Sequence, residues 1–181
     1  MGNYVMKKII VFFLLSTFYF LLTIPAHAGY VLPYPSYMPG NKLYNISRVI
    51  DSLKAYWYWG NIAKVKYHLG LANKYLVESK TLFEYKQYLL ATDALARSDT
   101  HVDNVLPYLK GAAVQGKDVK VLETTVGDAM LVHISVIETM KSQLPEKFIW
   151  RPEKASEIIL PISSMLQHAL TIRQNLRDEA K

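Results

Sequence analysis

Apolar residues recur at alternating intervals of three and four positions along most of the chain. This spacing places their side chains on one narrow face of an α-helix. Asn41 precedes the first such series and is a residue type that caps helix starts. We expect the apolar face of this first helix to pack against a partner helix. The series comprises Leu43, Ile46, Ile50, Leu53 and Trp57.

Four further series have the same period. They run from Ile62 to Leu76, from Tyr88 to Ala112, from Val119 to Met140 and from Ala155 to Leu176. Proline removes a backbone donor, so Pro107 and Pro161 predict kinks in the third and fifth helices. Pro152 fits the first turn of the fifth helix. Tight turns are predicted near residues 83–87 and 115–118, and a glycine in the second turn is suited to ending a helix.

These patterns predict an all-α fold, an antiparallel helical bundle of about four to five helices that occupies residues 43–181. Strand-type alternation is found nowhere at length. Gly60, which follows the sequence "YWYW" at Tyr56–Trp59, is expected to close the first helix. Gly70 lowers the helix propensity of the second helix and is expected to admit a close neighbour.

Residues 1–28 have the three-part layout of a secretory signal peptide. Lys7 and Lys8 precede an apolar run from Ile9 to Ile24, and Ala26 and Ala28 are small residues at the positions of a cleavage site. Because of these small residues, cleavage after Ala28 is favoured over retention as an anchor. In either case we expect the remainder to lie outside the cytoplasm, secreted or tethered to the outer face of the cytoplasmic membrane.

Residues 29–42 form a lead-in to the bundle that is rich in proline and tyrosine and is predicted to be extended. Four aromatic residues in and after it are candidates for partner binding: Tyr34, Tyr37, Trp57 and Trp59. Exposed, they would offer a sugar or a peptide a large contact area at low entropic cost. The favoured interpretation is that the tyrosines lie over the bundle and the tryptophans plug its end, since exposed aromatic patches are uncommon.

Composition limits the chemistry of the protein. The chain has no cysteine, which excludes disulfides, thiolate metal sites and a cysteine nucleophile. Its formal net charge is +6, but Lys7 and Lys8 belong to the leader, so 19 basic and 15 acidic residues follow Ala28 and leave a net charge of +4. This small surplus is typical of a solvated surface, and we expect no nucleic-acid partner.

The stretch from Met38 to Phe83 carries a family pattern. Pro39 is followed by Leu43 and Tyr44, and the next helix supplies Lys64, Leu69, Leu71, Ala72, Leu76 and Glu78. With these residues the chain resembles an all-helical extracytoplasmic domain family of bacteria and archaea that is catalogued only as a domain of unknown function. The chain departs from the family pattern at Lys74-Tyr75 and Ser79, and the resemblance ends near Ser98. It implies a secreted or membrane-tethered helical domain and brings no catalytic residues.

Four histidines follow the leader, each on a different predicted helix: His68, His101, His133 and His168. A helical bundle can gather metal or haem ligands from facing helices. His133 lies on the apolar face of its helix and is the best candidate. None of the four has a histidine or glutamate partner at helical ligand spacing, so we predict no metal site and no cofactor.

The segment "RSDTHVD" places Ser98, Asp99, His101 and Asp103 close together in sequence. On a helix, Asp99 and Asp103 share one face while Ser98 and His101 share another, so they do not form a serine triad. We interpret them as a polar helical surface. The chain also lacks a nucleophile elbow and a glycine-rich phosphate cradle, and we do not expect an enzyme.

The favoured function is that of a non-enzymatic binding or scaffolding module of the cell envelope. Its expected partner is another envelope protein or a wall polymer, with the membrane involved only through the leader if the leader is retained. The alternative is a bundle that binds a small ligand, metal or haem near His133 or the Met130 and Met140 region. An envelope hydrolase has the least support.

Overall fold

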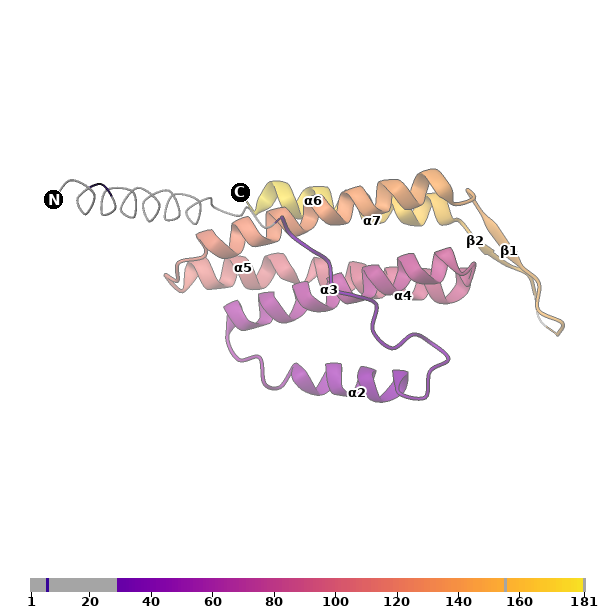
Figure 1. Cartoon of the computed structure of the whole chain (residues 1–181), viewed down its shortest axis with the longest axis horizontal. Coiled ribbons are helices and arrows are strands. Elements are labelled where there is room, and N and C mark those ends of the chain that lie inside the picture. Colours follow the sequence, from indigo (N-terminus) through magenta and orange to yellow (C-terminus); the bar gives the residue numbers. More distant parts are fainter. Residues whose placement is uncertain (1–5, 7–28, 155, 181) are drawn as a thin grey trace.

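The computed structural model describes Met6 and residues 29–154 and 156–180, so the predicted signal peptide lies outside the described residues apart from Met6. The described chain is an antiparallel helical bundle, as predicted (Figure 1). A two-stranded antiparallel hairpin, β1 (Phe148–Trp150) and β2 (Ile158–Leu160), precedes the last helix. The helices are α2 (Tyr44–Lys54), α3 (Asn61–Glu84), α4 (Tyr88–Asp103), α5 (Val105–Val114), α6 (Lys120–Gln143) and α7 (Ile162–Glu179).

Two pairs of helices form the body of the bundle. α3 packs along α4 and α5, and α6 packs along α7, while contacts between α4 and α7 join the two pairs. The lead-in crosses the body before the chain turns back into α2. This helix lies outside the two pairs as a separate layer beside α3 (Figure 1).

Two apolar clusters fill the body, one toward each end. Val65, Val105 and Val126 belong to the first cluster, and Leu82 and Ile137 belong to the second. Burial of these side chains is the main favourable term in folding, because the chain has no disulfide. Between the clusters, each long helix places a buried polar residue: Asn73 on α3, Ser98 on α4, His133 on α6 and Arg173 on α7.

The predicted turns are confirmed, and a break replaces the kink predicted in the third helix. Residues 85–87 join α3 to α4, with Lys86 at a φ of 58°. Gly116, at a φ of 71°, follows the end of α5. The helical series from Tyr88 to Ala112 is divided at Asn104 into α4 and α5, three residues before Pro107, because proline cannot donate to the preceding turn.

The prediction for the fifth helix is wrong at its start. Pro152 lies in the loop of the β1–β2 hairpin rather than in a first helical turn, and Pro161 precedes α7 instead of kinking it. The two strands consist of β-branched, leucine and aromatic residues, which favour strands. Their three-residue length is too short to give a clear alternation in the sequence.

The prediction for the end of the first helix is also wrong. α2 ends at Lys54, so Tyr56–Trp59 lie in the connection to α3. Gly60 has a φ of 82° but a ψ of 161°, and it precedes α3 instead of closing α2. Asn41 accepts a hydrogen bond from the backbone N–H of Leu43 at 2.9 Å and so supports the turn before α2. Among the described residues, no helix has the length and apolarity that crossing a membrane requires.

Candidate functional site

α2 turns its apolar residues away from the bundle. The side chains that its period places on one face are between 44% and 59% exposed. The expectation that this face packs against a partner helix within the domain is therefore wrong. We call this surface the α2 apolar face: Leu43, Ile46, Val49, Ile50 and Leu53.

Polar contacts hold the opposite face of α2 against α3. Asp51, only 5% exposed, accepts hydrogen bonds from the ammonium groups of Lys74 and Lys54. Lys74 also donates to the hydroxyl of Ser47 at 3.1 Å. The hydroxyl of Tyr67 donates to the backbone carbonyl of Asp51 at 2.9 Å. α2 is thus amphipathic, but its polar side packs against the bundle and its apolar side is exposed to solvent.

A buried carboxylate fixes the start of α2. The hydroxyl of Tyr44 donates to Oε1 of Glu78 at 2.7 Å. Glu78 is 2% exposed, and its other oxygen has no hydrogen-bond partner among the residues that the structure describes. Burial raises the pKa of the Glu78 carboxyl, opposed by the hydrogen bond from Tyr44 and by the charge of Lys74. Burial and the contact with Glu78 raise the pKa of Tyr44, so its hydroxyl stays a donor at neutral pH.

The aromatic residues after α2 are exposed. Trp57 and Trp59 are 76% and 83% exposed, and Tyr56 is 75% exposed. The indole N–H of Trp59 donates to the backbone carbonyl of Tyr56, which fixes the ring at the surface of the loop. The favoured interpretation that the tryptophans plug the end of the bundle is therefore wrong, and their side chains are available for contact.

The lead-in divides its tyrosines between surface and core. Tyr34 is 96% exposed and Tyr37 is 48% exposed, so the interpretation that they lie over the bundle is wrong for Tyr34 and largely wrong for Tyr37. Tyr30 instead packs against the first apolar cluster. Among the aromatic pairs of residues 29–154 and 156–180, none joins the lead-in tyrosines to Trp57 or Trp59.

Arg173 is the centre of a polar network inside the bundle. The side chain is fully buried, with one terminal nitrogen donating to Oδ1 of Asp99 at 2.7 Å and the other to the hydroxyl of Ser98 at 2.7 Å. Ser98 in turn donates to the backbone carbonyl of Ala72. The interpretation of Ser98 and Asp99 as a polar helical surface is therefore wrong. Their surroundings could not be read from α4 alone, since the cation that they bind comes from α7.

His133 completes this network and has no free nitrogen. Its Nδ1 accepts from Nε of Arg173 at 3.2 Å, and its Nε2 lies 2.8 Å from Oδ1 of Asn73. The amide of Asn73 donates to the hydroxyl of Tyr30 at 2.6 Å. Burial and the charge of Arg173 lower the pKa of His133, which keeps the imidazole neutral. Both ring nitrogens of His133, the best candidate metal ligand in the sequence, are therefore hydrogen-bonded within the core.

Two other histidines meet where α3 and α4 pack. Nδ1 of His68 lies 3.0 Å from Nδ1 of His101, and Tyr75 and Tyr108 stack on these two rings. Burial lowers the pKa of both imidazoles, that of His101 to about 4. Sequence spacing could not reveal this pair, because its members are on different helices. Within residues 29–154 and 156–180, no three histidine, aspartate or glutamate residues cluster as metal ligands.

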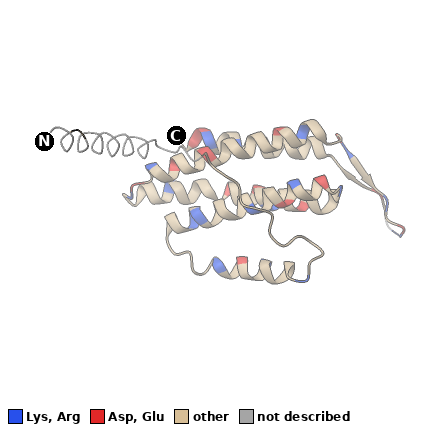
Figure 2. Ribbon diagram, viewed as in Figure 1, with Lys and Arg blue, Asp and Glu red and all other residues tan. Residues whose placement is uncertain are grey.

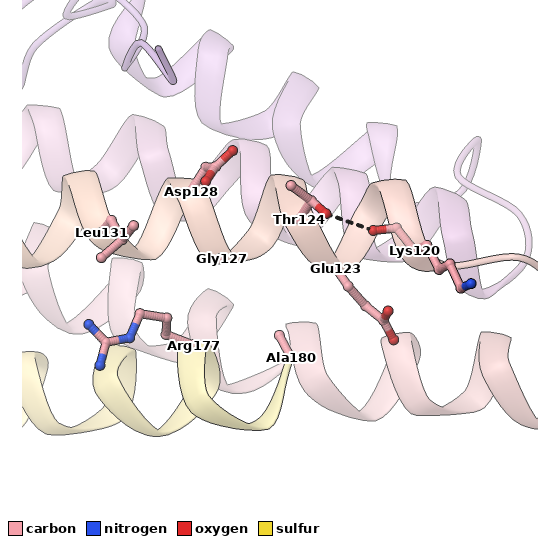
Figure 3. Close-up of a pocket in the computed structure, with 8 residues that line it drawn as sticks. All are labelled: Lys120, Glu123, Thr124, Gly127, Asp128, Leu131, Arg177 and Ala180. Atoms are coloured by element: carbon pink, nitrogen blue, oxygen red, sulfur yellow. Dashed lines mark hydrogen bonds between the residues drawn. The ribbon is translucent and has the colours of Figure 1, made fainter. Parts of the chain in front are cut away.

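Two clefts of the described part of the chain lie beside α6. One, of about 750 Å³, lies between the start of α6 and the end of α7, and both acidic and basic side chains line it, among them Lys120, Glu123, Asp128 and Arg177 (Figure 3). The other, of about 510 Å³, lies between α3 and α6 and is lined by Tyr30, Leu69, Asn73 and Val121, among others. Neither contains a residue that the sequence selected as a site.

Acidic and basic residues are interspersed along the helices (Figure 2). This agrees with the solvated, mixed surface expected from the sequence. The helix α2 is an exception, because its acid, Asp51, is buried and pairs with Lys54 and with Lys74 of α3, which leaves no acidic side chain exposed on this helix.

Comparison with known proteins identifies a family for most of the chain. The model of a family described as Domain of unknown function (DUF5667) matches residues 36–147. No curated protein and no solved structure matches the chain. The resemblance seen in the sequence is confirmed as far as a domain family of unknown function is concerned, and the match extends well beyond Ser98.

Proposed function

Because the chain belongs to the family described as Domain of unknown function (DUF5667), whose description names no activity, we propose its function from the surface it exposes: a non-enzymatic binding module of the cell envelope. The outward orientation of the α2 apolar face carries this proposal. Covering that face with a partner would remove contiguous apolar surface from water. The location outside the cytoplasm is part of the proposal and rests on the predicted signal peptide.

The interior of the bundle supports a structural role for its polar residues. Arg173, Asp99 and His133 satisfy one another within the core, as buried polar groups must to avoid a large desolvation penalty. Such groups rigidify a fold and specify one arrangement of helices. We therefore assign binding to the surface of the molecule and not to this network.

The exposed tryptophans extend the α2 apolar face along the chain. Trp57 continues the period of Leu43, Ile50 and Leu53, and Trp59 follows in the same loop. Tryptophan is enriched in contact surfaces because a large planar ring gives much contact area at little entropic cost. Tyr34 and Tyr37 remain candidates for the same contact.

Site-specific photocrosslinking in cells of the native host tests this proposal. A benzophenone amino acid at Val49, on the α2 apolar face, is expected to give adducts with another envelope component. The matched control is Val114, which is 88% exposed at the end of α5 and far from this face in sequence. Equal labelling at the two positions, or no adduct at position 49, would reject α2 as the binding surface.

A second candidate function is the binding of a small apolar ligand between α3 and α6. The observation that favours it is the cleft of about 510 Å³ lined by Ile62, Leu69 and Leu122, with Asn73 as a polar group. Ligand pockets commonly have this size and this mixture of apolar walls with few polar groups. Native mass spectrometry of protein purified from its host would show a bound small molecule, and protein free of any ligand would reject this candidate.

A further inference from the structure

The exposed side of α2 combines three features that together identify a class of partner. They are its apolar face, the aromatic residues that follow it and the basic residues beside it. The inference below rests on the proposed function, because it names the partner of the same surface. It also goes beyond the sequence, from which we expected membrane contact only through the leader.

The dimensions of α2 argue against a helix of another protein, or a second copy of this chain, as the main partner. The helix has 11 residues, so it presents about three turns and is about 16 Å long. One face of so short a helix falls well below the roughly 1,200–2,000 Å² that a stable protein interface buries. A bilayer does not need an extended complementary surface, since lipid adapts to any apolar face.

The aromatic residues lie where an interfacial helix would use them. Tyr56, Trp57 and Trp59 follow the C-terminal end of α2, and all three are at least 75% exposed. Tryptophan and tyrosine are enriched at the boundary between hydrocarbon and water, because their rings are amphipathic.

The charge around the apolar face has one sign. The charged residues between Asn41 and Gly60 are Lys42, Arg48, Asp51 and Lys54. Asp51 is buried and pairs with both Lys74 of α3 and Lys54, so this segment exposes no acidic side chain. Lys42 is exposed, Lys54 is partly exposed in its pair with Asp51, and Arg48 is half-buried. Basic residues beside an apolar stripe are the arrangement of helices that lie on anionic membranes.

The docking of α2 also explains how such a helix stays formed in water. An isolated helix of 11 residues would be marginal. The contacts of Asp51 with Lys74 and of Tyr44 with Glu78 hold it in place. These contacts use only the polar side of α2, so the apolar side is already exposed on a formed helix. Binding therefore carries no cost for folding the helix.

We propose that α2 lies in the plane of an anionic lipid bilayer surface, with the α2 apolar face at the boundary between headgroups and acyl chains. Trp57 and Trp59 lie at the same depth, the exposed Lys42 contacts the anionic headgroups, and Lys54, whose side chain is 46% exposed while it pairs with Asp51, lies near them. The bundle is held above the membrane through the contacts of α2 with α3. If the predicted export occurs, the lipid is that of a leaflet facing away from the cytoplasm.

Fluorescence quenching by vesicles tests the proposal with a local readout. The chain has three tryptophans, Trp57, Trp59 and Trp150, so Trp150→Phe leaves only the two at the proposed contact. Protein with this change, purified from the host envelope, is mixed with vesicles of phosphatidylcholine with 30% phosphatidylglycerol carrying brominated acyl chains. We expect a blue shift and quenching of the emission, both reduced by salt. Emission from these two residues does not report on the leader, whether or not it is retained.

Variants connect the signal to α2. Ile46→Ser with Ile50→Ser is expected to weaken vesicle binding about 100-fold, from the loss of two large apolar side chains at the interface. Lys42→Gln should weaken binding to anionic vesicles about fivefold and leave binding to phosphatidylcholine unchanged. Val114→Ser is the matched control, and circular dichroism checks that each variant is folded.

Several outcomes would overturn the inference and leave the proposed function intact. The first is unquenched tryptophan emission in protein that sediments with vesicles. A second is quenching that Ile46→Ser with Ile50→Ser does not reduce. A third is crosslinking from position 49 to a protein, or to a second copy of this chain, in place of lipid. The absence of every adduct from position 49 would instead reject the proposed function itself.

Discussion

Nδ1 of His133 accepts a hydrogen bond from Nε of Arg173 at 3.2 Å, inside a bundle in which both side chains are fully buried. This contact requires a neutral imidazole, because a protonated ring would place two cations in contact. Nε2 of His133 must then carry the proton and donate to Asn73. The core of the protein therefore depends on the protonation state of one histidine.

The first prediction is that the protein loses stability in mild acid. Burial and Arg173 lower the pKa of His133 well below 6.5, whereas the unfolded chain takes up a proton near pH 6.5. Below that pH the unfolded state binds more protons, so the free energy of unfolding falls as pH falls, by about 1.4 kcal/mol per unit for this group. His68 and His101, with pKa values that are also lowered, add to the slope. Denaturant titrations between pH 7 and pH 5 measure this dependence of the free energy of unfolding on pH.

A glutamine at position 133 is the control for this prediction. His133→Gln can accept from Arg173 and donate to Asn73, but it does not titrate. The variant should show a pH slope that is shallower by the equivalent of about one proton. An unchanged slope would mean that His133 does not set the acid sensitivity.

The second prediction concerns the ion pair of Arg173 and Asp99. Arg173→Met leaves the carboxylate of Asp99, which is 9% exposed, without its cation. Removing one partner of a buried pair costs about 3–5 kcal/mol. The pKa of the remaining acid, which burial already raises, should rise further once the charge of Arg173 is gone. Adding Asp99→Asn should recover part of the loss. Chemical denaturation of the single and double variants forms a cycle, and additive losses would show that the two residues are not coupled.

Periodicity alone allowed the long helices to be predicted. The series from Val119 to Met140 became α6, and Pro107 marked the division between α4 and α5, because both signals are local. Arg173 is a charged residue on the apolar face of the last helix, and this is the local signal of a buried polar network. Its partners, Ser98 and Asp99, are 75 and 74 residues away in sequence.

The orientation of α2 could not be predicted for a related reason. The period of Leu43, Ile46 and Ile50 shows that these residues share a face, but not whether that face is covered. Which face of α2 packs against the bundle is decided by the contacts of Asp51 and Tyr44. Their partners, Lys74 and Glu78, are 23 and 34 residues away in sequence. Local patterns do not report such pairings, so the aromatic residues were expected to pack although they are exposed.

The third prediction is that Gly70→Ala stabilises the protein. Gly70 is exposed in the interior of α3, and a Cβ at this position would have no atom of another described element within 4 Å. The expectation of a close neighbour is therefore wrong, and alanine should add about 0.5–1 kcal/mol by restricting the unfolded chain. Thermal unfolding measures the gain. Gly116→Ala is the contrasting variant, because a φ of 71° there strains any side chain and should lower the stability.

The fourth prediction is that α2 can be released while the bundle stays folded. Asp51→Ala removes the acceptor of Lys74 and Lys54, and a hydrogen bond to a charged group contributes about 1.5–3 kcal/mol. Amides of α2 should therefore exchange with solvent at least tenfold faster, while those of α3 and α6 keep their protection, since the two apolar clusters contain no residue of α2.

The matched control is Glu157→Ala, which removes the partner of Arg151 in an exposed ion pair at the β1–β2 hairpin. Exposed pairs of this kind contribute at most about 1 kcal/mol, so exchange in α2 should not change. If Asp51→Ala instead lowered protection throughout the bundle, α2 would be an integral part of the core. Local release would show that α2 is held by a few polar contacts. In that case Asp51→Ala should also weaken any binding that requires a formed α2 with its apolar face exposed.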